Sequence, residues 1–155
     1  MGIHLRYGDP SARGQENAIS AWYSGPALAR QIAATNGLFL VAEADDACLA
    51  FAQFVRRPGD SAELARIYVL PMHHGRTIGT QLLEEGLVWL RRAGISRLTV
   101  EVEEENPIGR RFYERKGFVE VGRSTQHVFD HDLSSISYER AVVNPLLDRT
   151  WGVRA

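Results

Sequence analysis

A glycine-containing loop between a strand pattern and a helix pattern constrains the fold of this chain most. Residues 63–70 (ELARIYVL) have the aromatic and β-branched content of a strand, and a loop at residues 71–80 (PMHHGRTIGT) follows them. The next apolar side chains recur at helical spacing and share one face of a helix: Ile78, Leu82, Leu83, Leu87 and Leu90. A strand, a short loop and an amphipathic helix in this order predict a sheet with a helix packed against it.

Further patterns extend this unit to a complete α/β fold. Residues 3–7 alternate as a short strand does, and residues 38–43 and 48–55 form a hairpin pattern around a short turn. Asn106 followed by Pro107 predicts a helix start, because Asn caps helices and Pro fits the first helical position. The other expected elements are a helix at 26–34, a strand at 97–103, a helix stopped by Gly117, and two strands around residues 130–132. This order predicts a mixed α/β sheet flanked by helices.

Length and charge bound the class of protein. The chain has 155 residues, which suits a single domain spanning residues 1–155. Its 18 Lys and Arg residues nearly balance its 19 Asp and Glu residues, so the net charge of −1 gives no electrostatic reason to bind nucleic acid or a membrane. No apolar run approaches the ~20 residues that span a bilayer, and the first residues lack a signal-peptide layout. We therefore expect a cytoplasmic protein without a nucleic-acid or membrane partner.

Cysteine and histidine usage gives no reason to expect a metal. Cys48 is the only cysteine, so neither a multi-cysteine zinc site nor an intramolecular disulfide can form. His73 and His74 are adjacent in a loop, and adjacent residues seldom converge on one ion. His127 and His131 lie four residues apart in a strand region, where convergence on one ion is equally rare. We expect no bound metal.

The loop at residues 71–80 has the features of an anion site. Gly75 and Gly79 lead into the helix, where backbone N–H groups lack intrahelical partners and the helix dipole adds partial positive charge. Such a helix start favours a phosphate or pyrophosphate, although the same pattern also occurs in simple tight turns. The loop lacks the Gly-Lys-Ser/Thr ending of a nucleotide P-loop and is not a GxGxxG motif.

Three segments together resemble the GNAT superfamily of N-acetyltransferases, over about residues 38–122. They are residues 63–71, the loop at 74–79, and residues 106–118 (NPIGRRFYERKGF), which match Asn-x-x-small-x-x-Phe-Tyr-x-x-x-Gly-Phe. The resemblance implies a single domain with a mostly antiparallel twisted sheet, a central V-shaped splay and flanking helices. It also implies a cofactor-binding core at about 62–122 and a C-terminal tail at 144–155. The segment after Val121 is faintly similar to the polyamine-acetylating branch.

The resemblance implies acetyl-CoA as co-substrate. In the family, backbone groups at Ile67, Tyr68 and Val69 would pair with the pantetheine arm. Asn106 and Tyr113 would also contact the cofactor. The residues that would wrap the pyrophosphate are His74, Gly75, Arg76, Thr77, Ile78, Gly79 and Thr80. Two of them depart from the family pattern, since His74 replaces Arg or Gln and Thr77 replaces Gly. Thr77 adds a Cβ and a hydroxyl beside the phosphates.

The resemblance also implies catalytic roles. Tyr113 would protonate the departing CoA thiolate, because a phenol is neutral at pH 7. Two carboxylates compete for the general base. Glu101 matches the catalytic Glu of ribosomal-protein N-terminal acetyltransferases, and Glu63 matches that of histone acetyltransferases. A water chain without either carboxylate is a third route. Backbone amides near Val69 would polarise the thioester carbonyl.

The sequence thus predicts an acetyl-CoA-dependent N-acetyltransferase that acylates a primary amine, small or polyamine-like, by direct attack in a ternary complex. One alternative is a protein Lys or N-terminal acetyltransferase. Another is a non-catalytic acyl-CoA-binding or regulatory module, which the departures at His74 and Thr77 favour. The partner is expected to be a small-molecule amine, and the apolar residues of the tail at 144–155 suit a homodimer contact.

Overall fold

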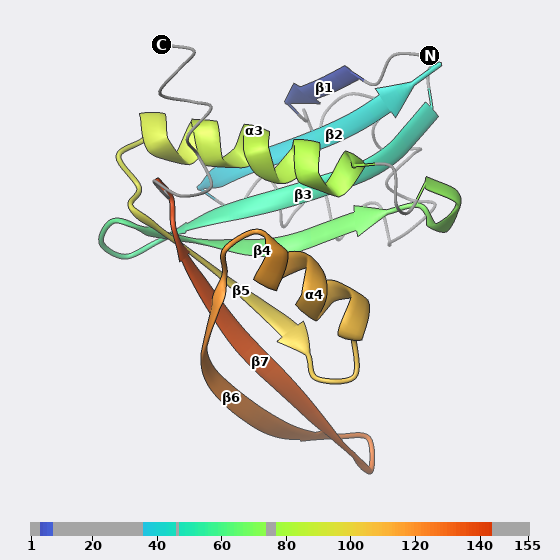
Figure 1. Cartoon of the computed structure of the whole chain (residues 1–155), viewed down its shortest axis with the longest axis vertical. Coiled ribbons are helices and arrows are strands. Elements are labelled where there is room, and N and C mark those ends of the chain that lie inside the picture. The colour runs from blue at the N-terminus through green and yellow to red at the C-terminus, as the bar shows by residue number, and fades with distance from the viewer. Residues whose placement is uncertain (1–3, 8–35, 46, 74–76, 144–155) are drawn as a thin grey trace. The chain divides into compact units, whose positions relative to one another are not determined.

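The computed structural model describes residues 4–7, 36–45, 47–73 and 77–143. In this part of the chain, the elements in order are β1 (His4–Tyr7), β2 (Gly37–Ala44), β3 (Ala47–Arg57), β4 (Ser61–Val69), the 3-10 turn η1 (Pro71–His73), α3 (Ile78–Arg92), β5 (Arg97–Glu103), α4 (Pro107–Arg115), β6 (Val119–Val128) and β7 (His131–Ala141) (Figure 1). The strand order is β1-β2-β3-β4-β5-β7-β6. The pairs β1–β2, β2–β3, β5–β7 and β6–β7 are all antiparallel. The expected α/β class with a mostly antiparallel sheet is confirmed.

The chain divides into two compact units. The first comprises residues 1–56 and 64–89, and the second comprises residues 57–63 and 90–155. The expected V-shaped splay and the single domain concern how these units meet, and they stay predictions. The expected helix at 26–34 and the tail at 144–155 lie outside the described residues.

In the first unit, the β2–β3 hairpin is buried on both faces. On one face, Phe39, Val41 and Phe51 form a core against which the Tyr68 ring packs. On the other face, Phe54 is fully buried and meets α3 at Gly86, where a Cβ would lie 2.1 Å from the Phe54 ring. Figure 1 shows α3 lying along this hairpin. Glycine is therefore required at this position, because any side chain would push the helix off the sheet.

Helix α3 forms as its apolar spacing predicts and ends in a Schellman motif. Its apolar face is buried: Ile78, Leu82, Leu83, Leu87 and Leu90. At the C-terminus, Gly94 has φ 78°, and its N–H donates to the Arg91 carbonyl at 3.1 Å. The Ile95 N–H donates to the Leu90 carbonyl at 2.9 Å. These two bonds satisfy carbonyls that the helix end leaves unpaired.

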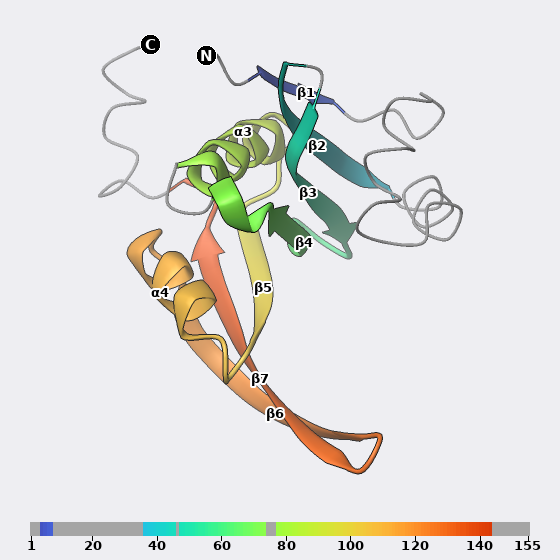
Figure 2. The same cartoon turned by 90° about the vertical axis from the view of Figure 1, so that its right-hand side faces the viewer.

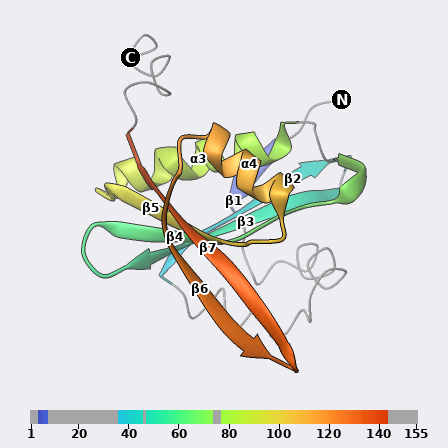
Figure 3. The ribbon, with the colours of Figure 1, turned by 60° about the horizontal axis from the view of Figure 1, so that its bottom comes forward.

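In the second unit, α4 is fixed to a three-stranded part of the sheet, β5–β7–β6 (Figures 2 and 3). Buried Arg140 on β7 donates from Nη1 to the Lys116 carbonyl at the end of α4, at 3.0 Å. Gly117 ends α4 with φ 86°. The final hairpin turns at Phe129 and Asp130, slightly earlier than the expected residues 130–132, because Val128 and His131 already pair across a two-residue turn.

Candidate active site

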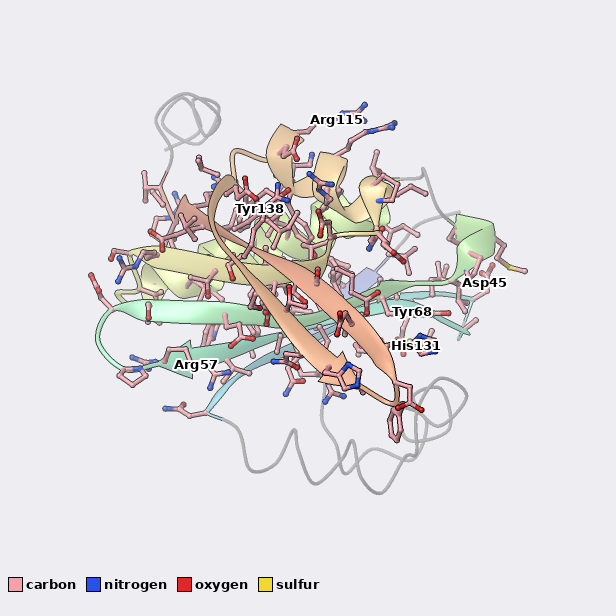
Figure 4. All side chains as sticks on the ribbon, turned by 90° about the horizontal axis from the view of Figure 1, so that it is seen from below. Asp45, Arg57, Tyr68, Arg115, His131 and Tyr138 are labelled. Carbon is pink, nitrogen blue, oxygen red and sulfur yellow. The ribbon has the colours of Figure 1, made fainter. Side chains whose placement is uncertain are left out.

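The end of β4 brings together the three residues expected along the pantetheine arm. Ile67, Tyr68 and Val69 are the last residues of the strand, and all three are half-buried. The Tyr68 ring stacks on Phe51 with centroids 6.1 Å apart (Figure 4). Just beyond the strand, the Leu70 N–H donates to the Leu49 carbonyl of β3 at 2.9 Å. The strand end is thus held firmly to its neighbour.

The start of α3 has the electrostatics of an anion site. Thr77 precedes the helix, and its carbonyl accepts the first helical hydrogen bond from the Gln81 N–H at 3.0 Å. By helix geometry, the N–H groups of Ile78, Gly79 and Thr80 have no intrahelical acceptor. The first turn carries no acidic residue that would repel an anion. The other expected loop residues, 74–76, lie outside the described residues.

Thr77 has a left-handed backbone, with φ 62°. A β-branched residue is strained there by roughly 1–2 kcal/mol, because Cβ crowds the backbone, whereas glycine has no such cost. This conformation explains physically why Gly is the usual residue at the corresponding family position. The Thr77 hydroxyl is an acceptor for Gln81 Nε2 at 3.4 Å, and its O–H remains able to donate.

Tyr113, the expected acid, is buried in α4. It is 5% exposed, and its ring meets Phe112 and Phe118 edge-on, with centroids 5.2 and 5.3 Å away. Desolvation by this burial raises the pKa of the phenol above its usual value. The hydroxyl therefore keeps its proton at neutral pH.

Asn106 caps α4 as expected. Its Oδ1 accepts from the Gly109 N–H at 3.0 Å. A Cβ on Gly109 would lie 2.6 Å from Asn106 Nδ2, so the small residue in this motif makes room for the capping amide. The cap uses Asn106 Oδ1. A cofactor contact, which is the expected second role of Asn106, would therefore have to use Nδ2.

The two candidate bases differ in their partners. Glu63 is half-buried and accepts hydrogen bonds on Oε2 from both Nε and Nη2 of Arg57. Glu101 is exposed on β5, where its Oε1 accepts from the Ser124 hydroxyl at 3.4 Å. Glu63 is thus held in an ion pair, while Glu101 has one long hydrogen bond to another described residue.

The acidic residues of the last hairpin do not gather around Glu101. The last β5–β7 pair joins Glu103 to Ser135, and Asp132 lies three residues further along β7, about 10 Å away at the usual strand rise. Asp132 also contacts His127 Nδ1 at 2.9 Å. The structure thus places Asp132, near the tip of the hairpin, apart from Glu101 and Glu103 of β5. Within the described ranges, no group of three or more His, Cys, Asp or Glu residues is arranged to hold a metal.

The sequence reasoning missed a partly buried polar network that joins α4 to β7. Tyr138 of β7 is 2% exposed, and its hydroxyl donates to Glu114 Oε1 at 3.0 Å (Figure 4). Arg110 Nε donates to the same hydroxyl at 3.4 Å, and Arg110 Nη1 donates to the Glu104 carbonyl at 3.4 Å. The only sequence signal was the alternation of β7, which places Tyr138 on a buried face but does not name its partners.

Sequence reasoning also considered His73 only as one half of a histidine pair. In the structure, the His73 side-chain Nδ1 is buried and has no hydrogen-bond partner in the part of the chain that is described. It lies in η1, directly after β4 and before the loop. A buried ring nitrogen without a partner is costly unless a bound molecule satisfies it.

In the described residues, no helix is long and apolar enough to cross a membrane.

Comparisons with known proteins identify the family of this chain. The sequence profile of the Acetyltransferase (GNAT) family matches residues 8–118. A spermidine N(1)-acetyltransferase of Thermoplasma acidophilum is 31% identical over 111 residues, which are 66% of this chain and 68% of that protein. A mycothiol acetyltransferase of Beutenbergia cavernae is 34% identical over 93 residues, which are 58% of this chain and 31% of that protein.

Solved structures share the fold at low sequence identity. An N-acetyltransferase from Staphylococcus aureus Mu50 has a TM-score of 0.78 and 21% identity, and the match covers 92% of this chain and 100% of that chain. The ribosomal-protein-S18-alanine N-acetyltransferase from Escherichia coli has a TM-score of 0.77 and 19% identity, over 92% and 96% of the two chains. Because the family profile spans more than half of the sequence, the chain belongs to the acetyltransferase (GNAT) family and is an N-acetyltransferase.

Proposed function

We propose that this chain uses acetyl-CoA to acylate a primary amine by direct attack in a ternary complex. One observation carries the proposal: the profile of the Acetyltransferase (GNAT) family matches residues 8–118, and Tyr113 lies within this match, buried on α4. A phenol is neutral at pH 7, so it has a proton to donate to the departing thiolate, which would otherwise leave as an anion.

The described residues at the start of α3 fit the acetyl-CoA pyrophosphate. The first helical turn offers N–H groups and carries no acid, and the buried His73 Nδ1 lacks a partner among the described residues. When bound, acetyl-CoA would supply the acetyl group activated as a thioester. We propose that Thr77 to Thr80 hold the pyrophosphate together with residues 74–76, and that the end of β4 (Ile67–Val69) holds the pantetheine arm.

For the general base we favour Glu101 over Glu63. To accept a proton from an amine, Glu63 would first have to break its ion pair with Arg57. Glu101 is exposed and gives up only the 3.4 Å hydrogen bond from Ser124. A water chain in place of either carboxylate predicts that substitution of both leaves turnover unchanged.

A small, cationic amine is the acceptor that we favour. The spermidine N(1)-acetyltransferase of Thermoplasma acidophilum is a relative at 31% identity. In this chain, Glu101 and Glu103 are both exposed on the same face of β5, opposite buried Val100 and Val102. Two carboxylates on one face attract a polycation and raise its local concentration.

The test is acetyl transfer by the purified chain to a panel of acceptors: spermidine, free amino acids, a Lys-containing peptide and a peptide with N-terminal Ala. Thiol release and the mass of each product would be measured, with CoA replacing acetyl-CoA as the control. We expect acetyl-spermidine to form fastest. Faster acetylation of either peptide would overturn the acceptor class. Binding of acetyl-CoA by calorimetry without transfer to any amine would overturn the catalytic proposal in favour of an acyl-CoA-binding module.

A further inference from the structure

Arg140 is the one charged side chain that is buried in the described ranges of the chain. It is 5% exposed, and it pairs across the sheet with fully buried Leu98 of β5. Ile136 and Tyr138, which precede it on the same face of β7, are buried as the alternation of a strand requires. A buried charge is costly unless it is hydrogen-bonded, so an apolar residue would be the ordinary choice here. The hydrogen bonds that Arg140 donates therefore identify what it stabilises.

Arg140 donates to two backbone carbonyls. Its Nε donates to the Ala141 carbonyl at 3.1 Å, and its Nη1 donates to the Lys116 carbonyl at 3.0 Å. The first bond orients the guanidinium on its own strand, and the second joins it to the end of α4. A charge-assisted hydrogen bond is stronger than a neutral one, and the helix dipole favours a cation at a C-terminus. Arg140 thus fixes the Lys116 carbonyl with respect to β7.

Lys116 is the C-cap residue of a Schellman motif that ends α4. Gly117 has φ 86°, and its N–H donates to the Glu114 carbonyl at 3.2 Å. The Phe118 N–H donates to the Tyr113 carbonyl at 3.0 Å. These two bonds and the left-handed glycine define the motif. The turn at residues 116–118 is therefore fixed to the last turn of the helix.

Tyr113 is joined to this turn through both its backbone and its ring. Its carbonyl accepts from the N–H groups of Lys116 and Phe118, each at 3.0 Å. Its ring meets the buried Phe118 ring edge-on at 5.3 Å, which is the apolar contact that often accompanies a Schellman motif. Among the residues of α4, all of which are described, Tyr113 alone is buried. A displacement of the turn therefore displaces the Tyr113 phenol.

We propose that Arg140 is a positioning residue for acetyl transfer: it holds the C-cap carbonyl of α4 and thereby keeps the Tyr113 phenol where it protonates the departing thiolate. This inference rests on the proposed role of Tyr113 as the acid. A general acid must lie within hydrogen-bond reach of the atom that it protonates, so a small displacement of the phenol lowers turnover. Arg140 acts through the turn at residues 116–118.

Tyr138 offers a matched comparison on the same face of β7. Its hydroxyl donates to Glu114 Oε1 at 3.0 Å, so it binds a side chain of α4 and not the backbone. The Glu114 side chain can change its rotamer when that bond is lost, whereas the Lys116 carbonyl moves only with the turn. Loss of the Arg140 contact should therefore lower turnover, and loss of the Tyr138 contact should lower only stability.

The test is a double-mutant cycle between Arg140 and Tyr113, measured as acetyl transfer. Arg140→Met keeps an apolar stem in the core and removes both hydrogen bonds. It should lower kcat about tenfold, while the dissociation constant of acetyl-CoA stays within about twofold. In a Tyr113→Phe background the same substitution should change kcat by less than about twofold, because the acid that it displaces is absent. Equal losses in the two backgrounds would overturn the inference.

Two further variants separate positioning from general destabilisation. Arg140→Lys keeps a cation that can donate to the Lys116 carbonyl, so kcat should stay within about threefold of the wild type. Tyr138→Phe should lower the melting temperature and leave kcat unchanged. A kcat as low as that of Arg140→Met in either variant contradicts the inference. If Arg140→Met does not fold, Arg140→Lys replaces it in the cycle, and its smaller loss should again disappear in the Tyr113→Phe background.

A measurement without turnover keeps this inference apart from the proposed function. In a chain labelled with fluorotyrosine, the fluorine resonance of Tyr113 is identified by its loss in Tyr113→Phe. Arg140→Met should shift or broaden this resonance more than Tyr138→Phe does. An unmoved resonance in folded Arg140→Met overturns the positioning by Arg140, whether or not the chain transfers acetyl groups. A shifted resonance together with an unchanged kcat in Tyr113→Phe would instead overturn the proposed acid, and with it the catalytic consequence of the positioning.

Discussion

The starts of α3 and α4 differ in what the chain offers to their unpaired backbone N–H groups. Each helix start leaves backbone N–H groups without intrahelical partners. At α4, Asn106 caps the Gly109 N–H and Pro107 removes one N–H altogether. At α3, Thr77 is in a strained left-handed conformation, and its hydroxyl contacts the Gln81 side chain instead. The chain thus satisfies the start of α4 with its own residues, whereas the start of α3, where we propose that the pyrophosphate binds, has no such cap among the described residues.

The largest effect is expected from a negative charge placed at the start of α3. Thr80→Glu should raise the dissociation constant of acetyl-CoA at least about tenfold, equivalent to ~1.4 kcal/mol, because the carboxylate repels the pyrophosphate. The same carboxylate should stabilise the helix by about 0.5 kcal/mol through its dipole. Calorimetric titration and thermal melting measure the two effects. Thr80→Gln is the neutral control, and equally weak binding by this control would refute the charge argument.

The burial of Tyr113 in α4 predicts a specific pH dependence of stability. The folded-state pKa is raised above the usual value of 10.0, so the folded chain holds the proton more tightly than the unfolded chain. The contribution is therefore fully present below pH 10 and is lost as the pH rises, with a limiting slope of about 1.4 kcal/mol per pH unit. Denaturant unfolding of the wild type and Tyr113→Phe from pH 8 to 11 measures it. Parallel curves for the two proteins would contradict the raised pKa.

The Asn106 cap of α4 should contribute measurably to the free energy of unfolding. Asn106→Ala should lower the free energy of unfolding by about 1 kcal/mol, because the Gly109 N–H loses its acceptor. Asn106→Asp keeps a capping oxygen and should stay within a few tenths of a kcal/mol of the wild type. Urea unfolding compares the three proteins. An alanine variant as stable as the wild type would remove the contrast with α3.

The smallest expected effect is relief of strain at Thr77. Thr77→Gly should raise the free energy of unfolding by less than ~1 kcal/mol, because the relief of the left-handed strain exceeds the added entropy of glycine only slightly. Acetyl-CoA should bind at least as tightly, since no Cβ then lies beside the proposed pyrophosphate site. Thr77→Ala keeps the Cβ and should remain strained. Urea unfolding compares the variants, and a glycine variant less stable than the alanine variant would show that left-handed strain does not control stability at this position.

Local sequence rules predicted the elements better than they predicted the site. The alternation of residues 97–103 gave the bounds of β5, and Asn106-Pro107 gave the start of α4, because both depend on short-range geometry. The left-handed conformation of Thr77 was not predicted, because β-branched residues disfavour that region. The hydrogen-bond partners of Tyr138 could not be predicted either, because β7 and α4 come together only in the folded chain.

Binding and turnover measured together in Tyr113→Phe test whether this residue is the acid. We expect the dissociation constant of acetyl-CoA to stay within about twofold while kcat falls about a hundredfold, the usual scale of general-acid catalysis. Tyr138→Phe is the matched control, because it removes an equally buried phenol that donates to Glu114, and it should lower stability while leaving kcat of the folded protein unchanged. An unchanged kcat in Tyr113→Phe would show that this residue is not the acid.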